Sequence, residues 1–271
     1  MIETEFALND QTRGYPTRKV ATTASRAEID RFVADGFLVY RGLLSSCMAI
    51  ELAQVVLRIA TAEAGRPESE YVPEQSIYIR ALLDKDTLFH PLLHLAPSLS
   101  LARTLLGPQV RIELEARMNY PGKAGVAVPW HGHLPVIPDP LPPLFCYPHQ
   151  VHCLIYLDQV GESEGALCIL PGSHMRPDVQ IPLGDNSDRE GQVEFFFEPG
   201  DAVLIHANTW HRTVPSSADA GFRRLLLIGY VPSWIRSDSQ QPGIRPDHPL
   251  TEDLARDADA ETLELLGSLQ W

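Results

Sequence analysis

Two histidines, His131 and His133, stand one residue apart in a strand-like segment of the chain. Residues i and i+2 of a strand point to the same face, so these two imidazoles can share one cation. A third histidine, His211, follows a second strand-like segment. Imidazole nitrogen is a ligand for iron, zinc, copper and nickel. The three histidines therefore form a candidate metal and catalytic site.

A set of short motifs surrounds these histidines in an order typical of one enzyme family. In chain order they are Ile29-Asp30-Arg31-Phe32 with Asp35-Gly36-Phe37-Leu38-Val39, Trp130-His131, Glu164-Gly165-Ala166-Leu167, Leu170-Pro171-Gly172-Ser173-His174, Pro199-Gly200-Asp201-Ala202-Val203 and Gly221-Phe222-Arg223-Arg224. Over roughly residues 25–235 the chain resembles the phytanoyl-CoA dioxygenase family. Members of that family are iron(II)- and 2-oxoglutarate-dependent oxygenases built on a double-stranded β-helix.

The resemblance implies a role for each matching residue. His131 and His211 match the two histidine ligands of the iron, and Arg223 matches the arginine that pairs with the far carboxylate of 2-oxoglutarate. Thr213 matches a hydroxyl that hydrogen-bonds the same carboxylate. A planar guanidinium can grip a carboxylate through two parallel hydrogen bonds. Because neighbouring strand residues face opposite ways, only one of Arg223 and Arg224 can enter the barrel, and the family match favours Arg223.

His133 departs from the family pattern, which has aspartate at this position. The usual iron triad consists of two histidines and one carboxylate. In one interpretation His133 is the third ligand, which gives a neutral three-histidine site and leaves the metal one unit more positive. In a second, His133 turns away, and water, chloride or a remote carboxylate such as Asp139 or Glu115 takes its place. In a third, the chain no longer carries out oxygenase chemistry.

The segment 111–120 alternates strongly and is expected to form the first strand of the barrel. Apolar or aromatic side chains alternate with Glu113, Glu115, Arg117 and Asn119. Such alternation gives a strand two distinct faces. If the polar face points inward, Arg117 and Asn119 can reach cofactor or substrate, and otherwise they are solvated. Asn119 is therefore included among the candidate cofactor-binding residues, with Arg223 and Thr213.

The order of elements predicts a mainly β protein with flanking helices. Helices are expected from Ser25 to residue 35, from Ser45 or Ser46 to about residue 63, and from Pro97 to Leu106. Short strand-like segments separated by turn signals follow. They predict a double-stranded β-helix, a jelly-roll or cupin-like barrel of about residues 110–235, with the N-terminal helices packed on one side.

Three regions complete the expected organisation. Residues 1–24 lack periodicity and are expected to form an extended arm, and residues 25–271 a single oxygenase domain. Residues 135–148 contain six prolines. Because proline cannot donate to a strand ladder, this segment is interpreted as a loop between strands, either an ordinary surface loop or a lid over the substrate.

Composition excludes several classes of protein. Of the 271 residues, 44% are hydrophobic and 21% charged, as in a globular protein and unlike a disordered or coiled-coil one. The net charge of −13 argues against a nucleic-acid binder, which usually carries a basic face. No apolar stretch approaches the roughly 18 residues of a membrane span, and no signal peptide is visible. Four cysteines without a CxxC pair lead us to expect a cytoplasmic protein.

Taken with the resemblance, these features predict an oxidoreductase. It would be an iron(II)/2-oxoglutarate-dependent dioxygenase that uses molecular oxygen to oxidise, in the simplest case to hydroxylate, a small organic metabolite, with decarboxylation of 2-oxoglutarate to succinate. The family covers lipids, amino acids and secondary metabolites, and the sequence does not choose among them or define an oligomeric state. Two other functions stay open: a three-histidine metal enzyme of cupin type that does not use 2-oxoglutarate, and a catalytically degenerate binding barrel.

Overall fold

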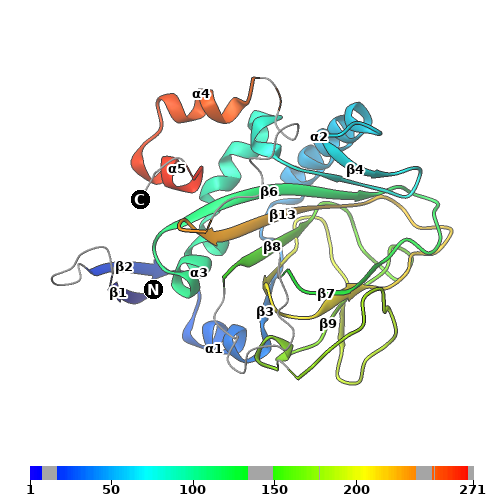
Figure 1. The fold of residues 1–271 in the computed structure, drawn as a ribbon, viewed down its shortest axis with the longest axis horizontal. Coiled ribbons are helices and arrows are strands. Elements are labelled where there is room, and N and C mark those ends of the chain that lie inside the picture. Colours follow the sequence, from blue (N-terminus) through cyan, green and yellow to red (C-terminus); the bar gives the residue numbers. More distant parts are fainter. Residues whose placement is uncertain (8–16, 134–148, 177, 236–245, 247, 268–271) are drawn as a thin grey trace.

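Two antiparallel β-sheets form the centre of the protein (Figure 1). The structure is a computed structural model that describes residues 1–7, 17–133, 149–176, 178–235, 246 and 248–267. The large sheet has the strand order β3-β11-β8-β13-β6-β5-β4, and the small sheet has the order β10-β9-β12-β7. Their bounds are β3 Phe37–Tyr40, β4 Ser69–Val72, β5 Ser76–Ile79, β6 Val110–Asn119, β7 Val128–His131, β8 Val151–Tyr156, β9 Leu167–Ile169, β10 Val193–Phe195, β11 Ala202–His206, β12 His211–Thr213 and β13 Arg223–Pro232.

Helices cover the outer face of the large sheet. Side chains of α2 and α3 share one apolar core with outward-facing strand residues such as Leu114, Ile155 and Leu226. The expected packing of N-terminal helices on one side of the barrel is therefore confirmed. The helices before β6 are α1 Arg26–Asp35, α2 Ser46–Glu63, η1 Leu82–Asp84, η2 Thr87–His94 and α3 Ala96–Leu106, and η3 Ser173–Met175 follows β9.

The first helix begins and ends where local chemistry requires. The hydroxyl of Ser25 accepts a hydrogen bond from the backbone of Glu28, and the Glu28 carboxylate accepts one from the backbone of Ser25, which makes a capping box. Gly36 ends the helix at a φ of +83°. A Cβ at Gly36 would lie 2.3 Å from Oγ1 of Thr209, so glycine allows this turn to contact the segment that leads to His211.

The alternation of β6 and β13 is explained by their two environments. Leu226 and Ile228 of β13 pack among the helices, whereas Leu225 and Leu227 face a cavity between the two sheets. Both faces are thus buried. The polar residues of β6 point to the inner face, where Arg117 lines the cavity.

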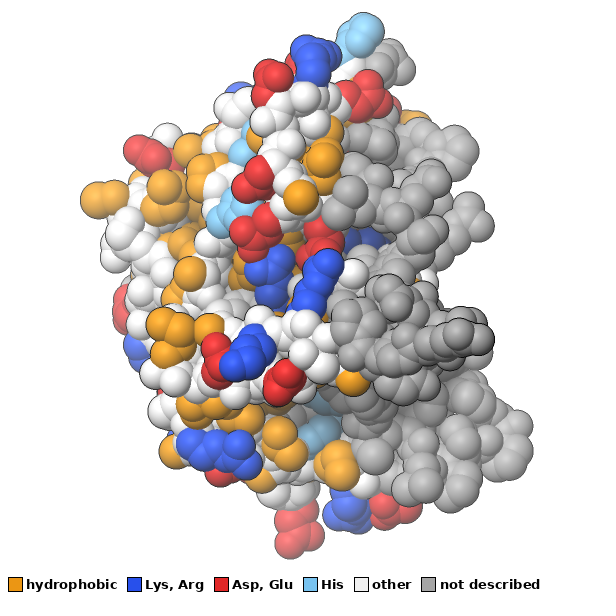
Figure 2. Space-filling view, turned by 90° about the vertical axis from the view of Figure 1, so that its left-hand side faces the viewer, with side chains coloured by type: hydrophobic (Ala, Val, Ile, Leu, Met, Phe, Trp, Pro, Cys, Tyr) orange, Lys and Arg blue, Asp and Glu red, His pale blue; other side chains and the backbone are white. Residues whose placement is uncertain are grey.

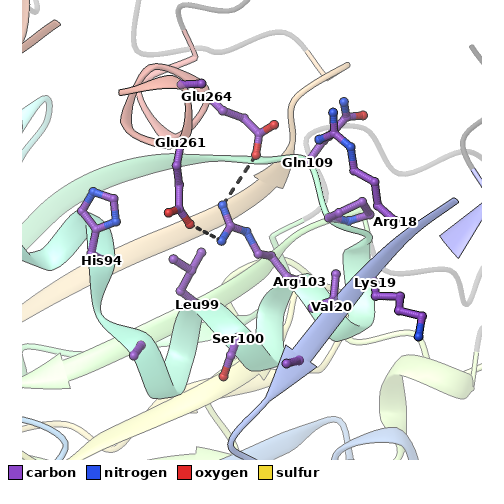
Figure 3. A pocket seen from close by; sticks show the side chains of 14 residues that line it. Arg18, Lys19, Val20, His94, Leu99, Ser100, Arg103, Gln109, Glu261 and Glu264 are labelled. Carbon is purple, nitrogen blue, oxygen red and sulfur yellow. Dashed lines mark hydrogen bonds and ion pairs between the residues drawn. The ribbon is translucent and has the colours of Figure 1, made fainter. Parts of the chain in front are cut away.

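Both ends of the chain attach to α3. The first 24 residues, expected as an extended arm, contain β1 (Ile2–Ala7) and β2 (Thr17–Thr22), which pair antiparallel, and β2 packs against α3. The C-terminal helices are α4 (Leu250–Arg256) and α5 (Ala260–Leu265). Arg103 of α3 pairs with Glu261 at 2.5 Å and with Glu264 at 3.6 Å, which holds α5 in place (Figure 3).

The surface mixes charges of both signs. Figure 2 shows acidic and basic side chains interspersed with apolar ones on one face of the molecule. No helix in the described part of the chain is long and apolar enough to cross a membrane. The proline-rich segment 135–148 lies outside the described residues, and the division into an arm and a single domain of residues 25–271 stays a prediction.

Candidate metal centre and its cavity

The three candidate histidines converge at the edge of the small sheet. His131 is the last residue of β7 and lies directly opposite His211, the first residue of β12. Opposite residues of an antiparallel pair have their Cβ atoms about 5 Å apart, which brings the two imidazoles within reach of one ion. His133 follows two residues after His131. One ligand atom from each of the three histidines lies within 4.8 Å of the others.

Two of the three rings are oriented by the backbone in the same way. Nδ1 of His131 lies 2.9 Å from the carbonyl oxygen of Pro129, and Nδ1 of His211 lies 2.9 Å from that of Thr209. Because a carbonyl oxygen can only accept, Nδ1 carries the proton, and the lone pair of Nε2 is free for a metal. His133 lacks such a bond, since its Nδ1 is buried without a hydrogen-bond partner.

Burial keeps the histidines neutral. The loss of hydration lowers the pKa of His131 and lowers those of His133 and His211 further. The proximity of the rings adds to the effect, because a charge on one disfavours a charge on the next. Neutral imidazole is the form that binds a metal, so the site needs little deprotonation before it accepts a cation.

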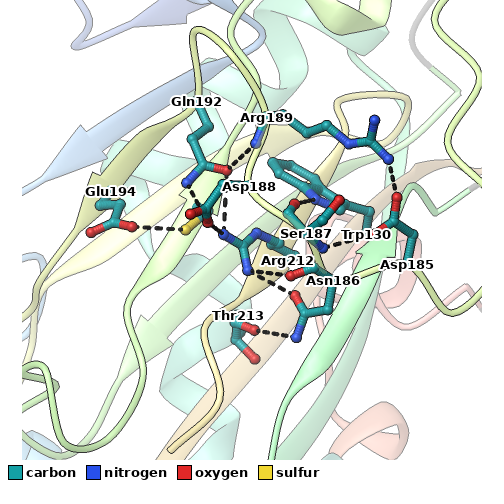
Figure 4. A network of polar contacts seen from close by, with 11 residues as sticks. Trp130, Asp185, Asn186, Ser187, Asp188, Arg189, Gln192, Glu194, Arg212 and Thr213 are labelled. Carbon is teal, nitrogen blue, oxygen red and sulfur yellow. Dashed lines mark hydrogen bonds and ion pairs between the residues drawn. The ribbon is translucent and has the colours of Figure 1, made fainter.

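A network of polar contacts joins the two ligand strands on the side away from the cavity (Figure 4). Trp130 precedes His131 and Arg212 follows His211, and both point away from the cavity toward the segment 185–192. Arg212 also pairs with Asp188 of that segment. The other bonds join Arg212 Nη1 to Asn186 O and Oδ1 (both 2.9 Å), Trp130 Nε1 to Ser187 O (2.8 Å) and Trp130 N to Asp185 O (2.9 Å).

A cavity of about 300 Å³ opens beside the histidines, between the two sheets. Its wall combines polar groups that converge on the histidines with an apolar surface. The lining residues are Tyr78, Arg117, Val128, His131, His133, His152, Leu154, Tyr156, Leu167, His211, Thr213, Arg223, Leu225 and Leu227. A mostly apolar pocket with a few convergent polar groups is typical of a small-molecule site.

Arg223 enters this cavity and Arg224 does not. The side chain of Arg223 is 3% exposed, and its Nε has no hydrogen-bond partner. Arg224, on the opposite face of β13, donates to Asp158 at 2.5 Å and to the carbonyl oxygen of Ala53 at 3.0 Å. Arg224 therefore ties the sheet to α2, whereas the guanidinium of Arg223 is available to a bound anion.

Of the other two candidate cofactor residues, Thr213 lines the cavity and Asn119 does not. Thr213 lines the cavity, and its hydroxyl accepts a hydrogen bond from the backbone of Val128 at 2.8 Å, so its own proton can be donated to a ligand. Asn119 lies opposite Arg223 in the β6–β13 ladder and is buried, with no partner for its Oδ1. Asn119 is not part of the described cavity wall and adjoins it only through Arg223.

Several residues of the cavity could not be selected from the sequence. His152 lines the wall, its ring centre is 3.9 Å from that of His133, and neither of its ring nitrogens has a hydrogen-bond partner. Tyr156 lies on the same face of β8, four residues on. Tyr78 belongs to β5, a strand that we did not predict, and lies opposite Arg117 in the β5–β6 ladder.

The family of the chain is decided by a sequence match. A model of the family described as phytanoyl-CoA dioxygenase (PhyH) matches residues 32–225. The chain belongs to the phytanoyl-CoA dioxygenase family. The resemblance carried by the motifs is thus confirmed. No curated protein sequence matches the chain closely enough to be called a relative.

Solved structures share the fold of this member of the phytanoyl-CoA dioxygenase family. HygX from Streptomyces hygroscopicus, solved with nickel, 2-oxoglutarate and hygromycin B, is 19% identical with a TM-score of 0.62, and the match covers 83% of this chain and 96% of HygX. The epimerase SnoN, solved with Fe3+, α-ketoglutarate and nogalamycin RO, is 21% identical with a TM-score of 0.58, over 82% of this chain and 91% of SnoN. The expected double-stranded β-helix is therefore confirmed.

The structure shows what surrounds His133, the residue at which this chain departs from the phytanoyl-CoA dioxygenase pattern. His133 faces the other two histidines. Of the remote carboxylates considered, Glu115 instead accepts a hydrogen bond from the hydroxyl of Tyr78, and Asp139 lies outside the described residues. Among the described residues, the metal-ligand group of three consists of histidines alone.

Proposed function

We propose that this chain is an iron(II)/2-oxoglutarate-dependent oxygenase that hydroxylates a small organic metabolite and converts 2-oxoglutarate to succinate. One observation carries the proposal: two backbone-anchored histidines, His131 and His211, share a cavity with the buried guanidinium of Arg223, whose Nε has no hydrogen-bond partner. A metal site and an anion site thus lie in one enclosure, as a dianion that chelates iron requires.

The donor set fits the metal. Three neutral imidazoles converge, and two already present Nε2 to a common point. We assign His131, His133 and His211 as the ligands of iron(II). Because these ligands are neutral, more of the positive charge of the ion is left for anionic ligands than in a site with a carboxylate.

The cavity also fits 2-oxoglutarate. Arg223 has a desolvated Nε with no partner, a state that costs free energy unless an anion satisfies it. In the proposal its guanidinium pairs with the far carboxylate, and the hydroxyl of Thr213 donates to the same group. Burial excludes water from this pair and strengthens it. Asn119 lies opposite Arg223 in the ladder and is buried beside this site.

Each polar residue then has a task in the reaction. The histidines hold the metal at one end of the cavity, and Arg223 fixes the co-substrate relative to it. Bound iron with 2-oxoglutarate and oxygen supplies the oxidation of an unactivated C–H bond. The apolar wall formed by Leu154, Leu225 and Leu227 excludes water and positions the substrate carbon.

A second candidate function is favoured by His133. A three-histidine centre without a carboxylate is also compatible with a metal enzyme of cupin type that does not use 2-oxoglutarate. In that case Arg223 binds substrate. This candidate predicts tight metal binding that 2-oxoglutarate leaves unchanged.

One spectroscopic experiment separates the candidates. Metal-free protein receives iron(II) and then 2-oxoglutarate without oxygen, and the visible metal-to-ligand charge-transfer band is recorded. We expect the band in the native protein and its loss in His211→Ala. Iron binding without the band favours the second candidate. If the protein binds no iron and shows no band, it is a barrel that has lost catalysis.

A further inference from the structure

The cavity contains a second arginine that the proposed function does not use. Arg117 on β6 lines the same wall as Arg223 on β13. In the β6–β13 ladder Arg223 lies opposite Asn119, and Arg117 is two residues further along β6, so the two arginines are diagonal neighbours on one face. Diagonal neighbours on a sheet lie about 7–8 Å apart, which is within reach of long side chains, so Arg117 can contact the same ligand as Arg223 or a second one.

Arg117 has no partner in the described part of the protein. Its Nε is shielded from solvent and makes no hydrogen bond. The acidic residue nearest along the same face of β6 is Glu115, which accepts a hydrogen bond from Tyr78 and lies 3.8 Å from Arg80. The pKa of Arg117 is lowered mainly by burial and, to a smaller extent, by the charge of Arg223. Arg117 is half-buried, and a partly desolvated cation next to another cation is costly unless an anion satisfies it.

The charges of the occupied cavity do not balance with 2-oxoglutarate alone. A divalent metal ion contributes two positive charges and the two arginines contribute two more, while 2-oxoglutarate brings two negative charges. The three histidines add none, and no aspartate or glutamate is among the described residues of the wall. An excess of two positive charges is left, and one further carboxylate would halve it. No described residue of the wall supplies that carboxylate, and the substrate is the remaining molecule of the proposed complex that can supply it.

We propose that Arg117 binds a carboxylate of the substrate, so that this enzyme acts on a small carboxylic acid. The inference rests on the proposed function and adds its substrate class. The planar guanidinium matches a carboxylate through two parallel hydrogen bonds. Tyr78, opposite Arg117 in the sheet, closes that side of the cavity, and the leucines around it suit an apolar body. A cavity of about 300 Å³, in the range of small-molecule sites, suits a small acid.

The test measures binding to the enzyme loaded with iron(II) and 2-oxoglutarate without oxygen. The probes are benzoate, phenylacetate and hexanoate, each paired with its neutral amide, and calorimetry gives their affinities. We expect at least one acid to bind about 30-fold or more tightly than its amide. Arg117→Met should lower the affinity for that acid about 30-fold or more and change the affinity for 2-oxoglutarate less than about threefold. The affinity of Arg117→Lys for the acid should lie between those of the native protein and Arg117→Met.

Controls separate the possible failures. Arg31→Met removes an exposed charge on α1 and should change neither affinity. If no acid binds better than its amide, the substrate class is wrong. If Arg117→Met weakens the binding of 2-oxoglutarate as strongly as Arg223→Met does, both arginines hold the co-substrate and the inference is overturned. If the native protein gives no charge-transfer band, the proposed function itself fails. The band in each variant also reports that the variant is folded.

Discussion

The guanidinium carbon of Arg212 lies 5.3 Å from the centre of the Trp130 ring, behind the two strands that carry His131 and His211. This contact joins β7 to β12 on the side away from the cavity. The same two residues bond to the segment 185–192, so this segment acts as a brace for the metal centre. Residues outside the cavity thus add to the strand pairing that places His131 opposite His211.

Arg212→Met should loosen this brace. The side chain is 2% exposed, and its loss leaves the polar groups of Asn186 without their partner. We expect the free energy of unfolding to fall by about 1–3 kcal/mol and the iron affinity by about 10–100-fold. Urea denaturation and elemental analysis measure the two effects. Arg189→Met, in the same segment but more exposed, is the control and should cost less than about 1 kcal/mol.

His131→Ala and His211→Ala should each abolish turnover and most iron binding. These two rings are held by backbone carbonyls, and a water in place of either imidazole binds far more weakly. Iron stoichiometry after anaerobic loading is the measurement, and His90→Ala, remote from the cavity, is the control. Normal iron content in either variant would show that the metal site lies elsewhere in the protein.

Arg223→Ala should weaken 2-oxoglutarate by about 30-fold or more, since truncating one partner of a buried charge pair costs about 2–5 kcal/mol. Arg224→Ala should behave differently, because its partner Asp158 lies outside the cavity. That variant should lose stability and keep its affinity for 2-oxoglutarate. Titration of the charge-transfer band and thermal unfolding separate the two effects, and the reverse ranking would show that the assignment of faces is wrong.

His133 can be tested by two substitutions. If it is a ligand, His133→Ala should lower iron occupancy sharply, and His133→Asp should rebuild the common triad and keep or improve iron binding. Turnover in the aspartate variant can be partial because aspartate is shorter than histidine. Elemental analysis and 2-oxoglutarate consumption are measured side by side. Full iron occupancy in His133→Ala would exclude the three-histidine centre.

Acid should destabilise the protein through His174, which is not one of the residues of the cavity wall. Burial lowers its pKa below the ordinary value of about 6.5. His174 therefore binds a proton more readily in the unfolded chain than in the folded protein. The free energy of unfolding falls as the pH drops below about 6.5. We expect His174→Gln to show a smaller loss of stability between pH 7.5 and pH 5. Urea denaturation at both values measures it, and equal pH dependence in both proteins would contradict the prediction.

The histidine cluster was predictable because its signal is local. The spacing of His131 and His133 predicted that both rings share one face, and they converge with His211 although β7 ends at His131. The motif order pointed to His211 and Arg223. The strand 110–119 was predictable for a similar reason, since its inner and outer faces meet different environments.

The rest of the cavity depends on pairings that no local pattern encodes. Tyr78 reaches the wall only because β5 pairs with β6, and β5 has four residues, too few for a clear alternation. His152 meets His133 across the space between two sheets. Whether the polar face of β6 points inward was likewise undecided until the sheets were placed, and Arg117 could not be assigned before that.

If His133 is the third ligand, as we propose, the all-histidine donor set affects which metal the protein acquires. Imidazole nitrogen suits nickel, copper and zinc as well as iron, and the general affinity order places all three above iron(II). Without a carboxylate to favour a harder ion, the metal in a preparation is decided by supply. Protein eluted from a nickel resin would then carry nickel, and removal of metal by a chelator followed by anaerobic reloading gives the iron form. An inactive preparation is thus informative only after its metal has been identified.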